Sequence, residues 1–389
     1  MLPEFDNTEV AFKYRSNQEL KQARFLFASM GSPSLTALGI AFTKFAMAIK
    51  LPINGIIKRT IFKQFCGGES IEEAADTAKM LGQYNIGVIL DYGVEGKEGE
   101  HEFDMAVPEF LKAIDFASSQ KNIPFISIKV TGFSRFALLE KLHAKVELNS
   151  AEQEEWKRVE QRIDKICARA AEKSIKVLVD AEESWIQDPI DELTDKMMEK
   201  YNKQNAFVYN TFQLYLHSRL PFLKKSFAHA QERKYLLGAK LVRGAYMEKE
   251  RARATEKNYP SPVQPDKQHS DKDYNEAVDF CIENLEQLEL FIGTHNEKSC
   301  MLAAQKMQTR NIDFKHPHIC FSQLFGMSDN ISFNLAQQGF HVAKYLPYGP
   351  VADVMPYLMR RAQENTSVAG QTGRELGLIN TELKRRKLL

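Results

Sequence analysis

The chain has 389 residues, of which 43% are hydrophobic and 26% are charged, a composition typical of a globular protein with one large or two modest domains. A net charge of +1 and a pI near 7.6 give no electrostatic case for wholesale binding to nucleic acid, so no nucleic-acid partner is expected. The five cysteines are scattered without CxxC spacing, which indicates neither a disulfide framework nor a metal site.

Helices are predicted for residues 1–80. The opening residues MLPEFDNTEV contain acids and no apolar run, unlike a signal peptide or a transit sequence, so we expect a cytoplasmic chain. Residues 34–49 form an apolar stretch that is too short and too interrupted for a membrane span, which needs about 20 apolar residues. The stretch could lie on a membrane surface, but a helix packed in the protein core is the favoured interpretation. Four basic residues follow it: Lys50, Lys58, Arg59 and Lys63.

From about residue 85, short apolar or β-branched runs alternate with amphipathic segments. The runs cover residues 86–92, 125–130, 176–181, 207–212, 239–243, 290–294, 319–324 and 341–346. Eight strands alternating with helices predict an α/β fold, either a closed parallel (β/α)8 barrel of the TIM type or a doubly wound open sheet. No GxGxxG follows any run, so the fingerprint of the dinucleotide-binding open fold is missing. We therefore expect a barrel domain over residues 81–389, preceded by the helical segment 1–80.

Polar residues gather where the predicted strands end, which is the end of a barrel that carries catalytic residues. In chain order they are Asp91, Lys129, Asp180, Gln213, Lys240 with Arg243, His295, Gln323 and Tyr345. Lys129 and Asp180 each end an apolar run, and a buried charge is costly unless it is paired, so the two are expected to pair or to face a ligand. Gly244 would let the backbone beside Arg243 approach a phosphate. Residues 251–275 contain three prolines and are interpreted as a loop that acts as a lid.

Residues 345–371 combine a turn with a helix that carries paired arginines. Four polar or aromatic residues recur at i, i+3, i+4 and i+7 and share one helical face: Tyr357, Arg360, Arg361 and Glu364. The other face is an apolar stripe formed by Val354, Met355, Leu358 and Ala362. Arginine suits the binding of a carboxylate because its planar guanidinium donates two parallel hydrogen bonds. The alternative is a solvated arginine pair that forms an ion pair with Glu364.

Five motifs in one order resemble the proline dehydrogenase family, the flavoenzymes of proline catabolism. They are SIK at 127–129, DAEES at 180–184, KLVRGAY at 240–246, GTHN at 293–296, and YLPYG with YLMRRAQEN at 345–365. The run KLVRGAYMEKERARA looks like the eukaryotic branch, since many bacterial members have arginine where Lys240 stands. The resemblance extends over residues 86–373 and includes nothing like the aldehyde dehydrogenase module of many bacterial relatives.

The resemblance implies a distorted (β/α)8 barrel that binds FAD. It also implies oxidation of L-proline to Δ1-pyrroline-5-carboxylate by hydride transfer to the flavin, the first step of proline catabolism. Electrons would then pass to a membrane quinone, with peripheral contact at the inner membrane. The amine must lose its proton before hydride leaves the neighbouring ring carbon, and either Asp180 or Lys129 is a candidate base.

The resemblance also implies roles for individual residues. Arg360 and Arg361 would grip the proline carboxylate, and Tyr345 would pack against the ring. The remaining residues of the substrate and catalytic group are Lys129, Asp180, Lys240 and Tyr357. Residues expected beside FAD are Ala181, Gln213, Arg243, Gly244, Ala245, Thr294, His295 and Glu364, with Lys240 near the flavin N5 and Glu364 pairing with the arginines.

Three other functions stay open at this point. A hydroxyproline dehydrogenase of the same superfamily is the nearest, although a smaller residue tends to replace the ring-packing tyrosine there, so Tyr345 favours proline. A Schiff-base aldolase could use Lys129 or Lys240 as its nucleophile. A non-catalytic carboxylate-binding protein would contain no flavin and would turn over no substrate.

Overall fold

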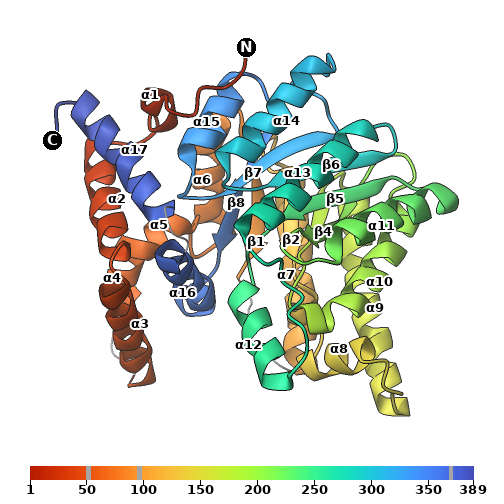
Figure 1. Ribbon diagram of the computed structural model, residues 1–389. Coiled ribbons are helices and arrows are strands. Elements are labelled where there is room, and N and C mark those ends of the chain that lie inside the picture. Colours follow the sequence, from red (N-terminus) through yellow and green to blue (C-terminus); the bar gives the residue numbers. More distant parts are fainter. Residues whose placement is uncertain (50–53, 94–98, 368–370) are drawn as a thin grey trace. The chain divides into compact units, whose positions relative to one another are not determined.

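The computed structural model describes residues 1–49, 54–93, 99–367 and 371–389. Eight parallel strands form a closed barrel in chain order (Figure 1), which confirms the predicted (β/α)8 fold. The strands are β1 Ile86–Tyr92, β2 Phe125–Ile128, β3 Lys176–Val179, β4 Val208–Gln213, β5 Leu237–Val242, β6 Leu288–Gly293, β7 Ile319–Leu324 and β8 Val342–Tyr348. Nearly every strand residue is buried, as expected for parallel strands covered on both faces.

Helices precede the barrel and connect its strands. Before β1 lie α1 Thr8–Ala11, α2 Asn17–Met30, α3 Pro33–Ala48, α4 Asn54–Ile57, a π-helical turn Lys58–Phe62, α5 Lys63–Phe65 and α6 Ile71–Gly82. Between β1 and β6 lie α7 Glu100–Ser118, a 3-10 turn Val130–Gly132, α8 Phe136–His143, α9 Ser150–Glu172, α10 Ser184–Tyr201, α11 Arg219–Arg233, α12 Met247–Lys257 and α13 Lys267–Glu283. The last helices are α14 Glu297–Thr309, α15 Asp329–Gln337, α16 Val351–Ser367 and α17 Gln371–Arg385.

The chain divides into two compact units. Unit 1 comprises Met1, Pro3–Glu95 and Gln323–Leu389, and unit 2 comprises Leu2 and Gly96–Ser322. The pairing of β1 with β8 lies in unit 1, and the successive pairings from β2 to β7 lie in or begin in unit 2. The sequence-based boundary at residue 80 separates helices from barrel and stays a prediction.

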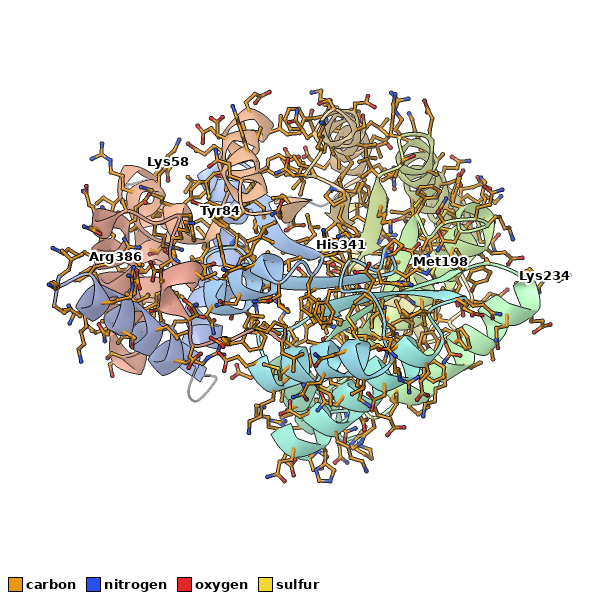
Figure 2. All side chains as sticks on the ribbon, turned by 90° about the horizontal axis from the view of Figure 1, so that it is seen from above. Lys58, Tyr84, Met198, Lys234, His341 and Arg386 are labelled. Carbon is orange, nitrogen blue, oxygen red and sulfur yellow. The ribbon has the colours of Figure 1, made fainter. Side chains whose placement is uncertain are left out.

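Unit 1 joins the two ends of the sequence. α17, the last helix of the chain, packs against α2, and the two helices lie side by side (Figure 1). The Thr8 hydroxyl donates to the buried carboxylate of Glu382 at 3.1 Å. Arg386, labelled in Figure 2, donates to the carbonyls of Phe12 and Arg15 at 2.9 Å each. These contacts give the first residues of the chain a place in the folded unit.

The interpretation of residues 34–49 as a core helix is wrong. They fall in α3, and no described residue of α3 is buried. Leu35, Leu38 and Phe42 are instead exposed, because only the opposite side of the helix, at Ile40, packs against the core of unit 1. Among the described residues, no single helix is long and apolar enough to cross a bilayer. Helix α2 and residues 34–43 together reach the required length and hydropathy, but the chain bends by 100° between them.

Several predicted strand ends differ from the observed ones. Tyr345 does not end β8, because the strand continues to Tyr348, which still pairs with Tyr92 of β1. Asp91 and Gln323 are the next-to-last residues of strands whose observed ends, Tyr92 and Leu324, match the prediction, whereas Lys240 lies in a strand that begins two residues earlier and ends one residue earlier than predicted. By contrast, Lys129, Asp180 and Arg243 follow directly after β2, β3 and β5, and Gln213 is the last residue of β4.

The predicted long loop at 251–275 is mostly helical. α12 and α13 cover all of it except residues 258–266. The segment MEKERARATEK of α12 is rich in residues with high helix propensity, and this outweighs the prolines, which fall in the short connection. The lid interpretation therefore applies to a helix and its connection, and its role as a lid stays a prediction.

Candidate active site

Three charged residues of unit 2 meet just beyond β2 and β3. The Lys129 ammonium lies 3.5 Å from one oxygen of Asp180, and the Lys240 ammonium lies 2.5 Å from the other. Lys129 and Asp180 pair as expected, whereas the participation of Lys240 comes from the register of β5. Burial opposes ionisation of Asp180, but Lys240 and then Lys129 outweigh it and lower the pKa of Asp180 to about 2. Asp180 is thus a carboxylate at neutral pH and a weak base.

Glu182 is a second carboxyl group in the DAEES motif, and no role was predicted for it from the sequence. It is buried, and it accepts hydrogen bonds from the backbone N–H of Thr131 at 3.2 Å and from the Thr131 hydroxyl at 2.5 Å. Burial raises the pKa of Glu182 to about 7, while Thr131 and Lys129 oppose the rise. A carboxyl with a pKa near neutrality can take up or release a proton at physiological pH, which is the property a general base requires. The sequence signal for it was its place in DAEES.

Arg243 organises a polar cluster at the N-terminus of α14. Its guanidinium donates to Thr294 and Ser299, at 2.9 Å each, and to Asp271 at 2.7 Å. It also stacks on Tyr274 with 4.0 Å between the guanidinium carbon and the ring centroid. A helix N-terminus beside an arginine attracts anions, so the cluster suits a phosphate.

The backbone after Arg243 is open. Gly244 has a φ of +92°, which L side chains rarely adopt, and nothing lies within 4 Å of where its Cβ would stand. Gly244 and Ala245 are both exposed. This geometry lets a bound group approach the main chain closely, as the sequence reading expected.

Gln213 offers a buried acceptor in the described part of unit 2. Its side-chain nitrogen donates to the carbonyl of Ala181 at 3.4 Å, while its oxygen has no hydrogen-bond partner among the described residues. A buried acceptor without a donor is costly, so the amide oxygen is suited to an N–H of a bound molecule such as the ring of a flavin. Gln213, Gly244 and the Arg243 cluster therefore fit FAD. His295 is half-buried in the loop after β6, next to Thr294.

The arginine helix of unit 1 is α16. Its apolar stripe is buried as predicted, and all four members, Val354, Met355, Leu358 and Ala362, belong to the hydrophobic core of the unit. Tyr357 is also buried, and the guanidinium carbon of Arg361 lies 5.2 Å from the centroid of its ring. Arg360 and Arg361 are both half-buried, so neither is a fully solvated surface residue. The side chain of Glu364 lies outside the described residues.

Tyr345 occupies the middle of β8 in unit 1. It is 9% exposed, and it is in register with Ile89 of β1. Within unit 1 the structure thus brings Arg361 to Tyr357. Within unit 2 it brings Lys129 and Lys240 to Asp180.

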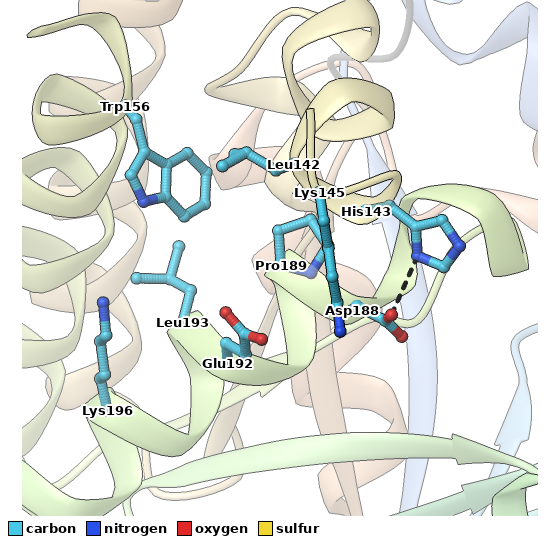
Figure 3. Close-up of a pocket in the computed structure, with 9 residues that line it drawn as sticks. All are labelled: Leu142, His143, Lys145, Trp156, Asp188, Pro189, Glu192, Leu193 and Lys196. Atoms are coloured by element: carbon cyan, nitrogen blue, oxygen red, sulfur yellow. Dashed lines mark ion pairs between the residues drawn. The ribbon is translucent and has the colours of Figure 1, made fainter. Parts of the chain in front are cut away.

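A cavity of about 300 Å3 lies elsewhere in unit 2, between α8, α9 and α10 (Figure 3). His143 and Asp188 form an ion pair on its wall, with 3.3 Å between Nδ1 and the carboxylate. The lining residues are Leu142, His143, Lys145, Trp156, Asp188, Pro189, Glu192, Leu193 and Lys196. None of them is a residue that the sequence reading assigned to substrate or cofactor.

A family model described as proline dehydrogenase matches residues 74–374. The chain belongs to the proline dehydrogenase family. Proline dehydrogenase 1, mitochondrial, of Dictyostelium discoideum is 35% identical over 384 residues, which cover 87% of this chain and 67% of that protein. Hydroxyproline dehydrogenase of Xenopus laevis is 29% identical over 413 residues, which cover 96% of this chain and 88% of that protein.

A solved structure of a proline utilization A protein supports the fold. The protein from Bdellovibrio bacteriovorus, inactivated by N-propargylglycine, superposes with a TM-score of 0.72 at 22% identity over 95% of this chain. The chain spans only 37% of that protein's length. The expected proline dehydrogenase family, enzyme class and barrel fold are confirmed, whereas the roles of individual residues stay predictions.

Proposed function

We propose that the chain oxidises L-proline to Δ1-pyrroline-5-carboxylate with bound FAD and passes the electrons to a quinone. The observation that carries the proposal is the family match over residues 74–374, which spans all five motifs. The clustered charges at Asp180 and the phosphate-suited cluster at Arg243 support it independently of the match.

FAD would lie against unit 2. We assign its phosphates to Arg243, Gly244 and the N-terminus of α14, and an N–H of its ring to the amide oxygen of Gln213. FAD supplies the two-electron acceptor when it is bound, and the protein supplies position and electrostatics. The remaining members of the assigned group are Ala181, Lys240, Ala245, Thr294, His295 and Glu364.

Proline would be held through its carboxylate. Arg360 and Arg361 carry the paired guanidiniums for that task, and Tyr345 and Tyr357 are assigned to its ring. The ring nitrogen must give up its proton so that its lone pair can form the C=N bond as hydride leaves the adjacent carbon. Asp180 is a weak base because its pKa is about 2, which favours Glu182, whose pKa is about 7, as the residue that takes the proton.

The test uses the purified chain, proline and a soluble dye acceptor. We expect a flavin absorption spectrum that bleaches on addition of proline, with dye reduction and formation of a cyclic imine. N-propargylglycine should cause progressive loss of activity, as it inactivated the Bdellovibrio protein. The proposal is contradicted if the folded protein takes up no flavin. It is also contradicted if the bound flavin stays oxidised after proline is added.

Hydroxyproline oxidation is the second candidate, because the Xenopus hydroxyproline dehydrogenase aligns over 96% of this chain. Tyr345 is the residue proposed to separate the two substrates. The aldolase alternative is disfavoured, since the family match over residues 74–374 is to proline dehydrogenase and both candidate lysines pair with the Asp180 carboxylate. A cytoplasmic chain with peripheral contact at the inner membrane stays part of the proposal.

A further inference from the structure

Exposed apolar side chains are concentrated on helices α3 and α4 of unit 1 and on Ile49 between them. Five of the eleven large hydrophobic side chains that are exposed in the described part of the chain fall within residues 35–56. They are Leu35, Leu38, Phe42, Ile49 and Ile56, and together they are called the α3–α4 surface. Single exposed apolar residues are ordinary, but a cluster marks an interaction site. We propose that the α3–α4 surface docks on an anionic lipid bilayer.

The exposed residues of α3 share one face. Leu35, Leu38 and Phe42 are spaced i, i+3 and i+7, so their side chains project from the same side of the helix. Ile40 lies on the opposite side and packs against the hydrophobic core of unit 1, as does Ile57 at the end of α4. The helix is therefore attached to the unit by one side and presents its apolar residues on the other. A helix that is attached by one side and exposes large apolar side chains on the other can bury those side chains in a membrane interface, where binding strength scales with the buried apolar area.

The charge of the same segment selects the partner. Residues 31–66 contain no Asp or Glu and five cations, in a chain with 51 acidic and 52 basic residues. The five cations are Lys44, Lys50, Lys58, Arg59 and Lys63. Two of them have carboxylate partners from outside the segment, Lys58 from Glu69 and Glu73 and Lys63 from Glu19, while Arg59 is exposed. Lys58 is labelled in Figure 2. Apolar and cationic residues together suit an anionic bilayer.

A second copy of the chain is a poorer occupant of this surface. A two-fold symmetric dimer would place each cationic segment against the identical cationic segment of its partner. Insertion across the bilayer is also disfavoured, since no single helix in the described residues is long and apolar enough to span it. Binding in the plane of the interface is the remaining arrangement.

Docking at this surface would bring the arginine helix close to the bilayer. α16 packs against α2, α3 and α4 within unit 1. A membrane quinone is the electron acceptor in the proposed function, and this part of the inference rests on that proposal. The vesicle measurements below need no turnover of proline, so their failure would leave the proposed function standing.

The first experiment measures co-sedimentation of the full chain with vesicles. The vesicles contain phosphatidylcholine alone or phosphatidylcholine mixed with phosphatidylglycerol. We expect binding to the mixed vesicles, and a loss of about tenfold or more in the partition coefficient for Leu38→Glu and for Phe42→Glu, because each removes a large apolar side chain from the interface. Met105→Glu in α7 is the matched control, since Met105 is also an exposed apolar helical residue, and it should bind like wild type.

The second experiment tests the charge. Arg59→Gln should weaken binding to the mixed vesicles by about fivefold and should leave weak binding to phosphatidylcholine unchanged. Phe42→Trp should shift its added fluorescence to shorter wavelength on mixed vesicles. This substitution keeps an aromatic side chain at the position and reports insertion directly, even if a glutamate variant folds poorly.

Three outcomes would overturn the inference. Wild type could fail to bind the mixed vesicles, or Leu38→Glu could bind as well as Met105→Glu. Alternatively, wild type could be a dimer that Leu38→Glu converts to a monomer while vesicle binding is retained, which would assign the surface to a second copy. Dye-linked proline oxidation by Leu38→Glu, measured in parallel, should match wild type.

Discussion

At the scale of single residues, the chemistry of the candidate site depends on how neighbouring charges change one another. Asp180 and Glu182 are two residues apart, yet the pKa of Asp180 falls to about 2 and that of Glu182 rises to about 7. The difference arises because Lys240 and Lys129 contact the first carboxylate, whereas burial dominates the second. Two carboxyl groups whose pKa values lie far apart can serve different roles, one as a fixed negative charge and the other as a group that takes up and releases a proton.

The raised pKa of Glu182 predicts a pH-dependent stability. A carboxyl whose pKa is higher in the folded state stabilises the fold below its unfolded pKa, near 4.5, and loses that contribution as pH rises through about 7. The loss amounts to about 3 kcal/mol. Glu182→Gln cannot ionise and should therefore be more stable than wild type at pH 9 but similar at pH 5, by urea unfolding.

The neighbouring Glu183 provides the control for that comparison. Its carboxylate pairs with Lys249 at 2.7 Å, and Glu183→Gln should retain most of the pH dependence of wild type, because the Glu183 charge adds less than burial to the raised pKa of Glu182. If Glu182→Gln and wild type differ equally at both pH values, Glu182 does not titrate near neutrality. In the proposed reaction, Glu182→Gln should also remove a pH dependence of kcat near pH 7.

The arginine pair predicts a selective loss of proline oxidation. Arg361→Met should leave flavin bound and lower kcat/KM by about thirtyfold to several thousandfold, since losing a charged partner in a desolvated site costs about 2 to 5 kcal/mol. Arg360→Met should behave alike. Arg233→Met, at an exposed position of α11, is the control and should change nothing. An unchanged kcat/KM for both α16 variants would show that the arginine pair does not bind the substrate carboxylate.

Tyr345 predicts the choice between proline and 4-hydroxyproline. An added hydroxyl that meets the tyrosine ring would clash or be buried without a partner, which costs about 1 to 3 kcal/mol, so proline should be preferred by about tenfold to a hundredfold. Tyr345→Ser should narrow that ratio, mainly by weakening proline. The measurement is kcat/KM for both substrates on both proteins. A ratio that does not move would show that Tyr345 does not face the ring.

At the scale of elements, α12 depends on a tertiary anchor. The backbone N–H and the hydroxyl of Ser184 donate to the two oxygens of the buried Glu250, at 2.7 and 2.6 Å. Lys249 pairs with Glu183 beside them, and Arg253 stacks on Trp185 with 4.4 Å between the guanidinium carbon and the ring centroid. The helix is thus attached to the residues that follow Asp180, because its own polar sequence provides little apolar surface for packing.

Removing this anchor should loosen α12 without unfolding the barrel. Glu250→Ala loses two buried hydrogen bonds, and we expect about 2 to 3 kcal/mol less protection of α12 amides from hydrogen exchange. Glu248→Ala, on the exposed side of the same helix, should leave the exchange unchanged. Equal exchange in the two variants would mean that Ser184 does not hold the helix.

At the scale of the whole molecule, a barrel that binds FAD should be stabilised by it. At a free FAD concentration of about 100 times Kd, binding contributes about 2.7 kcal/mol, which raises the thermal midpoint by several degrees. Riboflavin has no phosphates and should stabilise the apoprotein less. Arg243→Met should reduce the difference between the stabilisation by FAD and the stabilisation by riboflavin. If that difference stays the same, Arg243 does not bind the phosphates.

The sequence by itself determined the alternation of eight strands with helices, the family and the apolar stripe of α16, because these are local patterns of period and composition. Tertiary structure decided that Lys240 joins Lys129 at Asp180, since residues 51 and 60 positions from their partners meet only through strand register. It also decided that α3 is exposed. An apolar run reads the same in a core as on a surface, and only the packing of Ile40 shows which side is covered. The near-neutral pKa of Glu182 likewise depends on burial, which is set by the packing of distant segments and cannot be read from the residues around Glu182.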